Sequence, residues 1–174
     1  RHDVDRQPKN ALKMASLEKK FGIVSTYYFR ALTGIFDKNT ISEIYEMGHE
    51  IGYHYEVLAI NNGNKEKAIA LFERELQKFR EITPISTICM HGSPLSSWKD
   101  SDLWSEYDFS NFNIVGEAFL SIDYNKVNYF TDTGRSWKGY DYNVRDIVKS
   151  SLKQKKILDT TDLINSLPFI QNDI

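Results

Sequence analysis

The sequence has one cysteine, Cys89, among 174 residues, so an intrachain disulfide is excluded. It also lacks any run of roughly 18 apolar residues, the length that a membrane-spanning helix needs. Its charges nearly cancel, with 22 Lys and Arg against 24 Asp and Glu. The resulting net charge of −2 offers no general attraction to a nucleic-acid backbone or an anionic membrane. We therefore expect neither a membrane span nor a nucleic-acid partner.

No signal peptide opens the chain, which favours a cytoplasmic location, although Arg1 rather than a methionine comes first. At this length a single core buries roughly 70% of the surface of the unfolded chain, so the fold needs no structural metal. We expect any bound metal to serve chemistry.

Residue periodicity indicates the class of fold. Apolar residues at helical spacing predict helices over residues 8–21, 39–48, 64–82, 144–154 and 160–167. β-Branched and aromatic residues predict strands over residues 23–30, 50–55, 85–92, 113–122 and 127–134. In the second helix, Thr40 and Glu43 have the spacing of a capping box. This alternation is typical of an α/β parallel sheet or barrel, in which functional side chains gather at the carboxyl ends of strands.

Two carboxylates lie close together near the start of the chain. In "RHDVDR", Asp3 and Asp5 are two residues apart, so both project to the same side of an extended segment. Neighbouring carboxylates repel each other, and a divalent cation resolves the conflict when one binds the ion while the other accepts a proton from water. The alternative is a turn whose aspartates pair with Arg1 and Arg6.

All four histidines lie within the first 91 residues, and three of them fall at or near predicted strand ends. In "GHEIGYHYE", His49 and His54 are five residues apart, one more than the zinc-protease pattern requires. Along a strand this spacing places the two rings on opposite faces, so only one reaches a site. His91 ends a predicted buried strand and is a candidate third metal ligand or proton carrier. The alternative for each histidine is a structural hydrogen-bonded residue.

Asp3, Asp5, His54 and His91 together predict an oxygen-and-nitrogen metal site, which suits Zn²⁺ or a similar first-row divalent ion. Further along the chain, "TDTGRSW" combines Asp132, Arg135 and Trp137. This segment is a candidate for positioning a carboxylate and offering an aromatic surface to a substrate, or else a set of surface ion pairs. Aromatic residues such as Trp98, Trp137 and Tyr140 either stack against a sugar ring or fill the core.

The ordered motifs "RHDVDR", "GHEIGYH" and "MHGSP" resemble those of the polysaccharide deacetylases, the NodB-homology group or carbohydrate esterase family 4. The longer segments "RHDVDRQPKNALKMASLEKKFGIVSTYYFR", "GHEIGYHYE" and "TDTGRSW" are similar to a bacterial branch found with surface-polysaccharide biosynthesis genes. The likeness covers the chain from Arg1 to about Arg145. It implies an irregular (β/α)7 barrel, here a single domain over 1–174 that lacks its first strand and last motif.

The resemblance also implies an activity, the removal of N- or O-acetyl groups from sugars by a metal-dependent hydrolase of non-peptide C–N bonds. Asp3 matches the catalytic base, Asp5 the metal-binding aspartate and His54 the first metal-binding histidine of the family. Leu58 stands where most members have a second histidine ligand. We expect His91 to fill that vacancy, with Glu56, His49 or water as the alternatives.

Two further roles depart from the family pattern. His91 stands roughly where many members have an arginine near the base, so Arg135 or Arg145 is expected to orient Asp3. The general-acid histidine of the last motif has no counterpart after His91, which leaves His91 as the candidate that protonates the leaving amine.

Three other functions compete with a deacetylase acting on a sugar or polysaccharide precursor. A non-catalytic sugar-binding or scaffold protein on the same fold would explain Leu58 and the missing late histidine. A metal-dependent hydrolase of a non-sugar amide or cyclic ureide would keep the chemistry and change the substrate. A nucleotide-sugar glycosyltransferase would use Asp3 and Asp5 as a metal-bridging pair. The sequence leaves the oligomeric state open.

Overall fold

The computed structural model describes residues 1–93, 95–132, 137, 148–152 and 157–167. The chain divides into two compact units, Arg1–Ser121 and Ile122–Ile174. In chain order, the first unit contains β1 (His2–Val4), α1 (Pro8–Lys20), β2 (Thr26–Phe29), α2 (Lys38–Glu46), β3 (Glu50–Tyr55), α3 (Val57–Ile60), α4 (Lys65–Arg80), β4 (Thr87–Met90), the 3-10 helices η1 (Asp100–Ser105) and η2 (Phe109–Phe112), and β5 (Gly116–Glu117). The second unit contains α5 (Thr160–Ser166).

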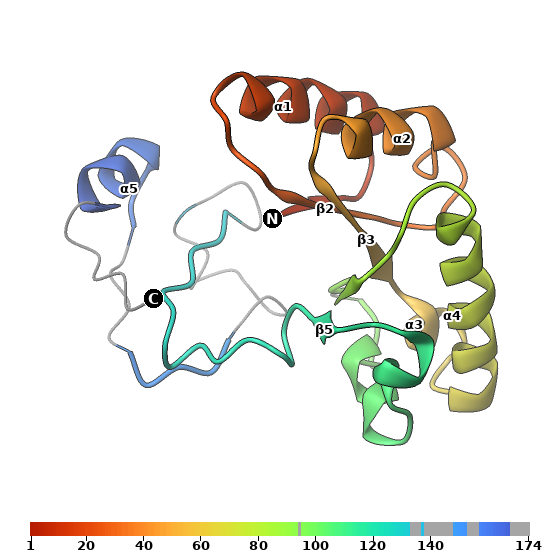
Figure 1. Ribbon diagram of the computed structural model, residues 1–174. Helices are drawn as coiled ribbons and strands as arrows, with labels where there is room; N and C mark the ends of the chain where they lie inside the picture. Colours follow the sequence, from red (N-terminus) through yellow and green to blue (C-terminus); the bar gives the residue numbers. More distant parts are fainter. Residues whose placement is uncertain (94, 133–136, 138–147, 153–156, 168–174) are drawn as a thin grey trace. The chain divides into compact units, whose positions relative to one another are not determined.

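The five strands form one sheet in the order β1-β2-β3-β4-β5, and every neighbouring pair is parallel (Figure 1). The predicted α/β class with a parallel sheet is therefore confirmed, whereas closure into a barrel stays a prediction. Among the described residues, none of the helices combines the length and apolarity needed to cross a bilayer.

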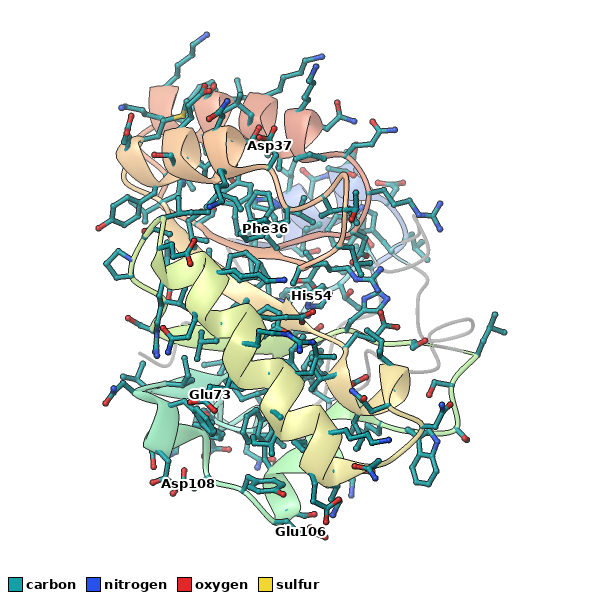
Figure 2. All side chains as sticks on the ribbon, turned by 90° about the vertical axis from the view of Figure 1, so that its right-hand side faces the viewer. Phe36, Asp37, His54, Glu73, Glu106 and Asp108 are labelled. Atoms are coloured by element: carbon teal, nitrogen blue, oxygen red, sulfur yellow. The ribbon has the colours of Figure 1, made fainter. Side chains whose placement is uncertain are left out.

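Helix starts follow local side-chain chemistry. Asn64 begins α4 by accepting a hydrogen bond from the backbone N–H of Lys67. The predicted capping box of α2 is wrong, because Asp37 begins that helix two residues before its expected start at Asn39 (Figure 2). The Asp37 carboxylate accepts from the Asn39 N–H at 3.2 Å and from the Thr40 hydroxyl at 2.9 Å. Thr40 is thus a partner of the cap rather than the cap itself.

Regular structure is shorter than predicted after β4. The strand expected over 113–122 spans only Gly116–Glu117, because the Glu117 carboxylate accepts the N–H groups of Phe119 and Leu120 and turns the chain. Residues 127–132 contain no strand, which contradicts the prediction there; β propensity alone does not form a strand without a neighbour. The described part of the predicted helix 144–154, residues 148–152, is not helical.

Hydrogen bonds to residues 26 positions earlier in the chain account for the missing helix at 148–152. The Ser150 hydroxyl donates to the Tyr124 carbonyl, and the Ser151 N–H donates to the Asn125 side chain at 2.8 Å. Such side-chain and backbone bonds compete with helical ones. The predicted helix 160–167 is confirmed as α5, begun by Asp159, which accepts from the Asp162 N–H.

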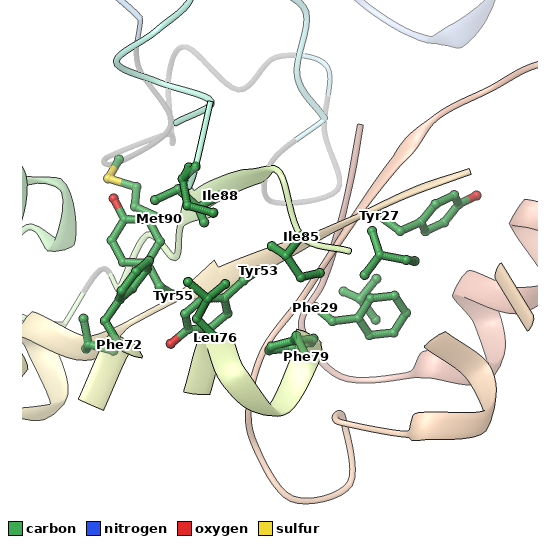
Figure 3. Packing of buried hydrophobic residues seen from close by; sticks show 14 of the residues in the cluster. Tyr27, Phe29, Tyr53, Tyr55, Phe72, Leu76, Phe79, Ile85, Ile88 and Met90 are labelled. Carbon is green, nitrogen blue, oxygen red and sulfur yellow. The ribbon is translucent and has the colours of Figure 1, made fainter. Parts of the chain in front are cut away.

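The main core lies between one face of the sheet and helices α1, α2 and α4. Tyr53 and Tyr55 of β3 point toward Phe72, Leu76 and Phe79 of α4, and all five are fully buried (Figure 3). The Tyr53 ring lies 5.4 Å from that of Phe72 and 5.2 Å from that of Phe79. Each such side chain contributes about 1.5–3 kcal/mol through burial, so this contact fixes which face of β3 points inward.

The opposite face of the sheet carries polar side chains, and we call it the polar face. Its residues share register positions across the strands: Asp3, Thr26, Tyr28, Glu50, Gly52, His54, Thr87 and Cys89. The Glu50 carboxylate accepts hydrogen bonds from Thr26 at 2.6 Å and from Thr87 at 2.7 Å. Because side chains alternate along a strand, the packing of Tyr53 and Tyr55 in the core places His54 on the polar face.

Gly52 is required by a close approach on the polar face. A methyl group at this position would lie 2.3 Å from two ring atoms of Tyr28 and 3.1 Å from the Thr87 carbonyl oxygen. We expect Gly52→Ala to lower the free energy of unfolding by about 1–3 kcal/mol, as measured by urea denaturation. In a Tyr28→Ala background the same change should cost less, and an equal cost in both backgrounds would contradict the assignment to the ring.

Candidate metal centre

Three predicted metal ligands meet at the carboxyl edge of the sheet. Asp5 follows β1, His54 lies near the end of β3, and His91 follows β4. Asp5 Oδ1 lies 3.5 Å from His54 Nε2 and 3.3 Å from His91 Nδ1, and the two ring nitrogens are 3.3 Å apart. The fold therefore brings together residues that are 49 and 37 positions apart (54 − 5 and 91 − 54) in the sequence.

These separations fit a tetrahedral ion. Zinc bonds to oxygen and nitrogen of about 2.0–2.1 Å, at tetrahedral angles, separate neighbouring ligand atoms by about 3.3–3.4 Å. The three observed separations lie at or next to that range. Three protein ligands with a remaining open position are typical of catalytic rather than structural zinc sites. The group could therefore hold a metal ion.

The Asp5 carboxylate supports the same conclusion. Its Oδ1 is shielded from solvent and has no hydrogen-bond partner, which is costly for a charged oxygen unless a cation is near. Burial raises the pKa of Asp5, but hydrogen bonds and charge attraction from His54 and His91, when these rings are protonated, lower it by more, so its pKa lies well below the ordinary range. The carboxyl is therefore charged at neutral pH, the form that binds a metal.

His54 is held with the correct nitrogen free. The side chain is 3% exposed, and its Nδ1 lies 3.0 Å from the Cys89 carbonyl oxygen (Figure 2 labels His54). Because a carbonyl only accepts hydrogen bonds, Nδ1 carries the proton and Nε2 has an available lone pair. That lone pair is on the side of the ring next to Asp5, so Nε2 and the Asp5 carboxylate can bind the same metal ion.

Asp3 lies near one of the three ligands, His54, on the polar face. Donor atoms of Asp3, His54 and Cys89 lie within 4.8 Å of one another, which makes a second, overlapping group able to hold a metal. Asp3 also pairs with Arg1 at 3.2 Å, and its side chain is 29% exposed. The Asp5 side chain is 43% exposed, so the two carboxylates do not differ by overall burial; only Oδ1 of Asp5, the oxygen next to the histidines, is shielded from solvent.

The residues expected as alternatives to His91 for the third ligand position do not belong to the cluster of Asp5, His54 and His91. His49 accepts from the Ser25 N–H at 3.2 Å and donates to the Ala15 carbonyl at 3.0 Å, so both of its nitrogens are used structurally. It lies among residues of the helix-covered side, opposite His54, as the spacing predicted. Leu58 is buried in the core and has no donor atom. Glu56 approaches His91 from the side of Nε2, away from the Nδ1 that faces Asp5.

Three charged residues support the site and were not expected from the sequence. Arg30, which follows β2, forms an ion pair with Glu56. Asp100 Oδ1 accepts the N–H groups of Leu58 at 2.7 Å and of Ala59 at 3.2 Å. Glu117 accepts the Met90 N–H at 2.9 Å, next to His91. No local pattern marks these residues, because their partners are distant in the sequence.

The remaining predicted residues belong to the second unit. Asp132 is exposed, and Trp137 donates from Nε1 to the Thr160 hydroxyl at 2.9 Å. Arg135, Tyr140 and Arg145 lie outside the described residues. Their roles in orienting Asp3 or binding substrate stay predictions.

Neither protein-family models nor curated protein sequences match this chain.

We expect the protein to bind one Zn²⁺ at Asp5, His54 and His91. Asp5→Ala, His54→Ala and His91→Ala should each weaken zinc binding by at least about 100-fold, because each removes one of three protein ligands. Asp3→Asn is the control and should bind zinc as the wild type does. Competition with a chromophoric chelator measures the affinities, and full zinc affinity in the Asp5 variant would contradict the ligand set.

Asp100 predicts a pH dependence of stability. Burial raises its pKa from the ordinary 3.8 to about 6, although the hydrogen bonds from Ala59 and Leu58 lower it. Between these values the folded state binds more protons than the unfolded state, so its stability falls as pH rises. The loss approaches about 3 kcal/mol above pH 6.

Asp100→Asn keeps an oxygen for the two N–H groups and cannot ionise, so this fall should be absent from the variant. Urea denaturation at pH 4.5 and pH 7.5 compares the two proteins. An equal pH dependence in both would show that Asp100 has an ordinary pKa.

Proposed function

We propose that the protein is a metal-dependent hydrolase that removes an acetyl group from an acetylated sugar or polysaccharide precursor. The observation that carries the proposal is the convergence of Asp5 Oδ1, His54 Nε2 and His91 Nδ1 within 3.3–3.5 Å. A carboxylate oxygen of Asp3 lies within 4.8 Å of a ring nitrogen of His54. A divalent cation such as Zn²⁺, when bound by the three ligands, supplies a Lewis acid for the acetyl carbonyl and lowers the pKa of water.

Asp3 has the position of the general base. Its carboxylate is close to His54 and partly exposed, so it can contact both the substrate and a water molecule. The ion pair with Arg1 orients this carboxylate. Asp3 takes the proton from the attacking water, and Asp5 stays with the ligands.

The leaving group also needs a proton. His91 has Nδ1 within the ligand cluster and Nε2 facing Glu56, so neither nitrogen is available to a leaving amine. Once Asp3 has accepted the proton of water, it becomes an acid at the same place. We infer that Asp3 returns this proton to the leaving group, which replaces the acid role first considered for His91.

An aromatic surface at the same edge of the sheet favours a sugar. Trp98 lies in the segment after β4, and three of its ring atoms are each 2.6 Å from a Cβ built at Gly63. Equal distances to three ring atoms place Gly63 against the face of the ring rather than its edge. Trp98 is nevertheless 46% exposed. Its other face is therefore a candidate surface for the C–H groups of a pyranose ring.

The order of the strands and the placement of the helices support a proposal for the whole fold. Strands that follow in sequence order, with the helices α1, α2 and α4 packed against one face, are the arrangement of a singly wound barrel rather than a doubly wound sheet. We propose that the sheet belongs to an irregular (β/α)7 barrel whose interior is the polar face.

One observation favours a second candidate, a non-catalytic sugar-binding protein on the same fold. The apolar Leu58 stands where the resembled family has a histidine ligand, and it is buried in the core. A hydrolase of non-sugar amides would share the metal chemistry and differ in the substrate alone.

Release of acetate tests the proposal. The zinc-loaded protein, incubated with acetylated amino sugars and oligosaccharides, should release acetate, measured by an enzyme-coupled assay. Asp3→Asn should lower the rate by about 10²- to 10⁴-fold while zinc binding is retained, because it removes proton transfer alone.

Asp102→Asn, an exposed aspartate in η1, is the matched control and should keep wild-type activity. Zinc binding without acetate release from any acetylated sugar would contradict the proposal in favour of the sugar-binding protein. Hydrolysis of a non-sugar amide alone would favour the third function.

A further inference from the structure

His91 lies between two partners, one at each ring nitrogen. Its Nδ1 faces His54 Nε2 and Asp5 Oδ1, both at 3.3 Å. Its Nε2 faces the Glu56 carboxylate at an ion-pair distance of 3.9 Å. The two nitrogens thus face different groups, the ligand cluster and a carboxylate behind it.

The position of the proton on His91 follows from His54. Since His54 Nδ1 donates to the Cys89 carbonyl, the Nε2 of neutral His54 can only accept a hydrogen bond. The 3.3 Å contact between the two histidines therefore requires the proton of neutral His91 to be on Nδ1. A metal ion at the cluster requires that same nitrogen to be free of a proton.

We propose that metal binding changes the tautomer of His91, and that Glu56 is the positioning residue that accepts the new N–H. One proton leaves Nδ1 for solvent, one proton is taken up from solvent at Nε2, and the imidazole stays neutral. Closure of the 3.9 Å separation makes a carboxylate–histidine–metal arrangement, which orients the ring and strengthens its Nδ1 as a ligand. This inference rests on the proposed metal site and extends it to a residue that does not bind the ion.

Arg30 holds Glu56 in place. The two residues follow adjacent strands, β2 and β3, and their side chains form an ion pair in which each is 15% exposed. Glu56 therefore presents Oε1 to His91 while its Oε2 is bound to Arg30. A carboxylate anchored by a guanidinium reaches the imidazole from one fixed direction, so it favours one orientation of the ring.

The tautomers can be observed directly by ¹⁵N NMR of the full chain with labelled histidine at pH 8, where an ordinary imidazole is neutral. His54 should carry its proton on Nδ1 with and without Zn²⁺. His91 should carry it on Nδ1 without zinc and on Nε2 with zinc. A zinc-loaded protein in which His91 keeps its Nδ1 proton would overturn the proposal.

Zinc affinity tests the part played by Glu56. Glu56→Ala should weaken zinc binding by about 10- to 100-fold, and Glu56→Gln should weaken it less, because an amide oxygen still accepts the Nε2–H. Glu106→Gln removes another ion-paired carboxylate, which pairs with Lys65 away from the site, and should not change the affinity. A merely structural role of Glu56 would change the melting temperature and leave the affinity of the folded protein unaltered.

The outcomes separate this inference from the proposed function. Wild-type affinity in a folded Glu56→Ala variant overturns the inference and leaves the hydrolase standing. Absence of acetate release with normal zinc binding overturns the hydrolase and leaves the inference standing. A wild-type protein that binds no zinc overturns both.

Discussion

The alternation of side chains along parallel strands is the constraint on which the site depends. Tyr53 and Tyr55 are fully buried against α4, so His54 between them must lie on the other face. Ile88 and Met90 are also buried in the core, and their burial fixes which face of β4 points inward at the end of this strand. His91 follows that strand end. A shift of one residue in register would exchange the faces and take the histidine out of the site. The candidate metal centre is thus positioned by apolar packing on the opposite side of the sheet.

Buried carboxylates stabilise the carboxyl edge around the centre. Asp100 binds the backbone at the start of α3, and Glu117 binds Met90 immediately before His91. Burial raises the pKa of both groups, so holding them charged costs stability. That cost is offset by backbone hydrogen bonds, which fix the segments that carry Glu56 and His91. Positioned ligands with a rigid surrounding shell are what a metal site requires.

Several elements could be read from local sequence because the signal is local. The strand Glu50–Tyr55 and the helices near residues 8–20 and 65–80 agree with their periodicity, which reflects one buried face per element. The predictions were wrong where a contact with a residue distant in the sequence decides the secondary structure. Residues 127–132 have strand-forming composition but no strand, and Ser150 bonds to Tyr124 instead of continuing a helix.

For the site, the sequence by itself determined which residues carry metal-binding chemistry and that strand ends hold His54 and His91, whereas the strand before Asp5, β1, was not among the predicted strands. It did so because ligand chemistry belongs to residue types and strand ends follow from periodicity. Only the tertiary structure decided that the three donor atoms meet, that His49 is structural and that Glu56 lies behind His91. Those outcomes depend on register between strands and on buried backbone hydrogen bonds, which join residues that no local pattern connects.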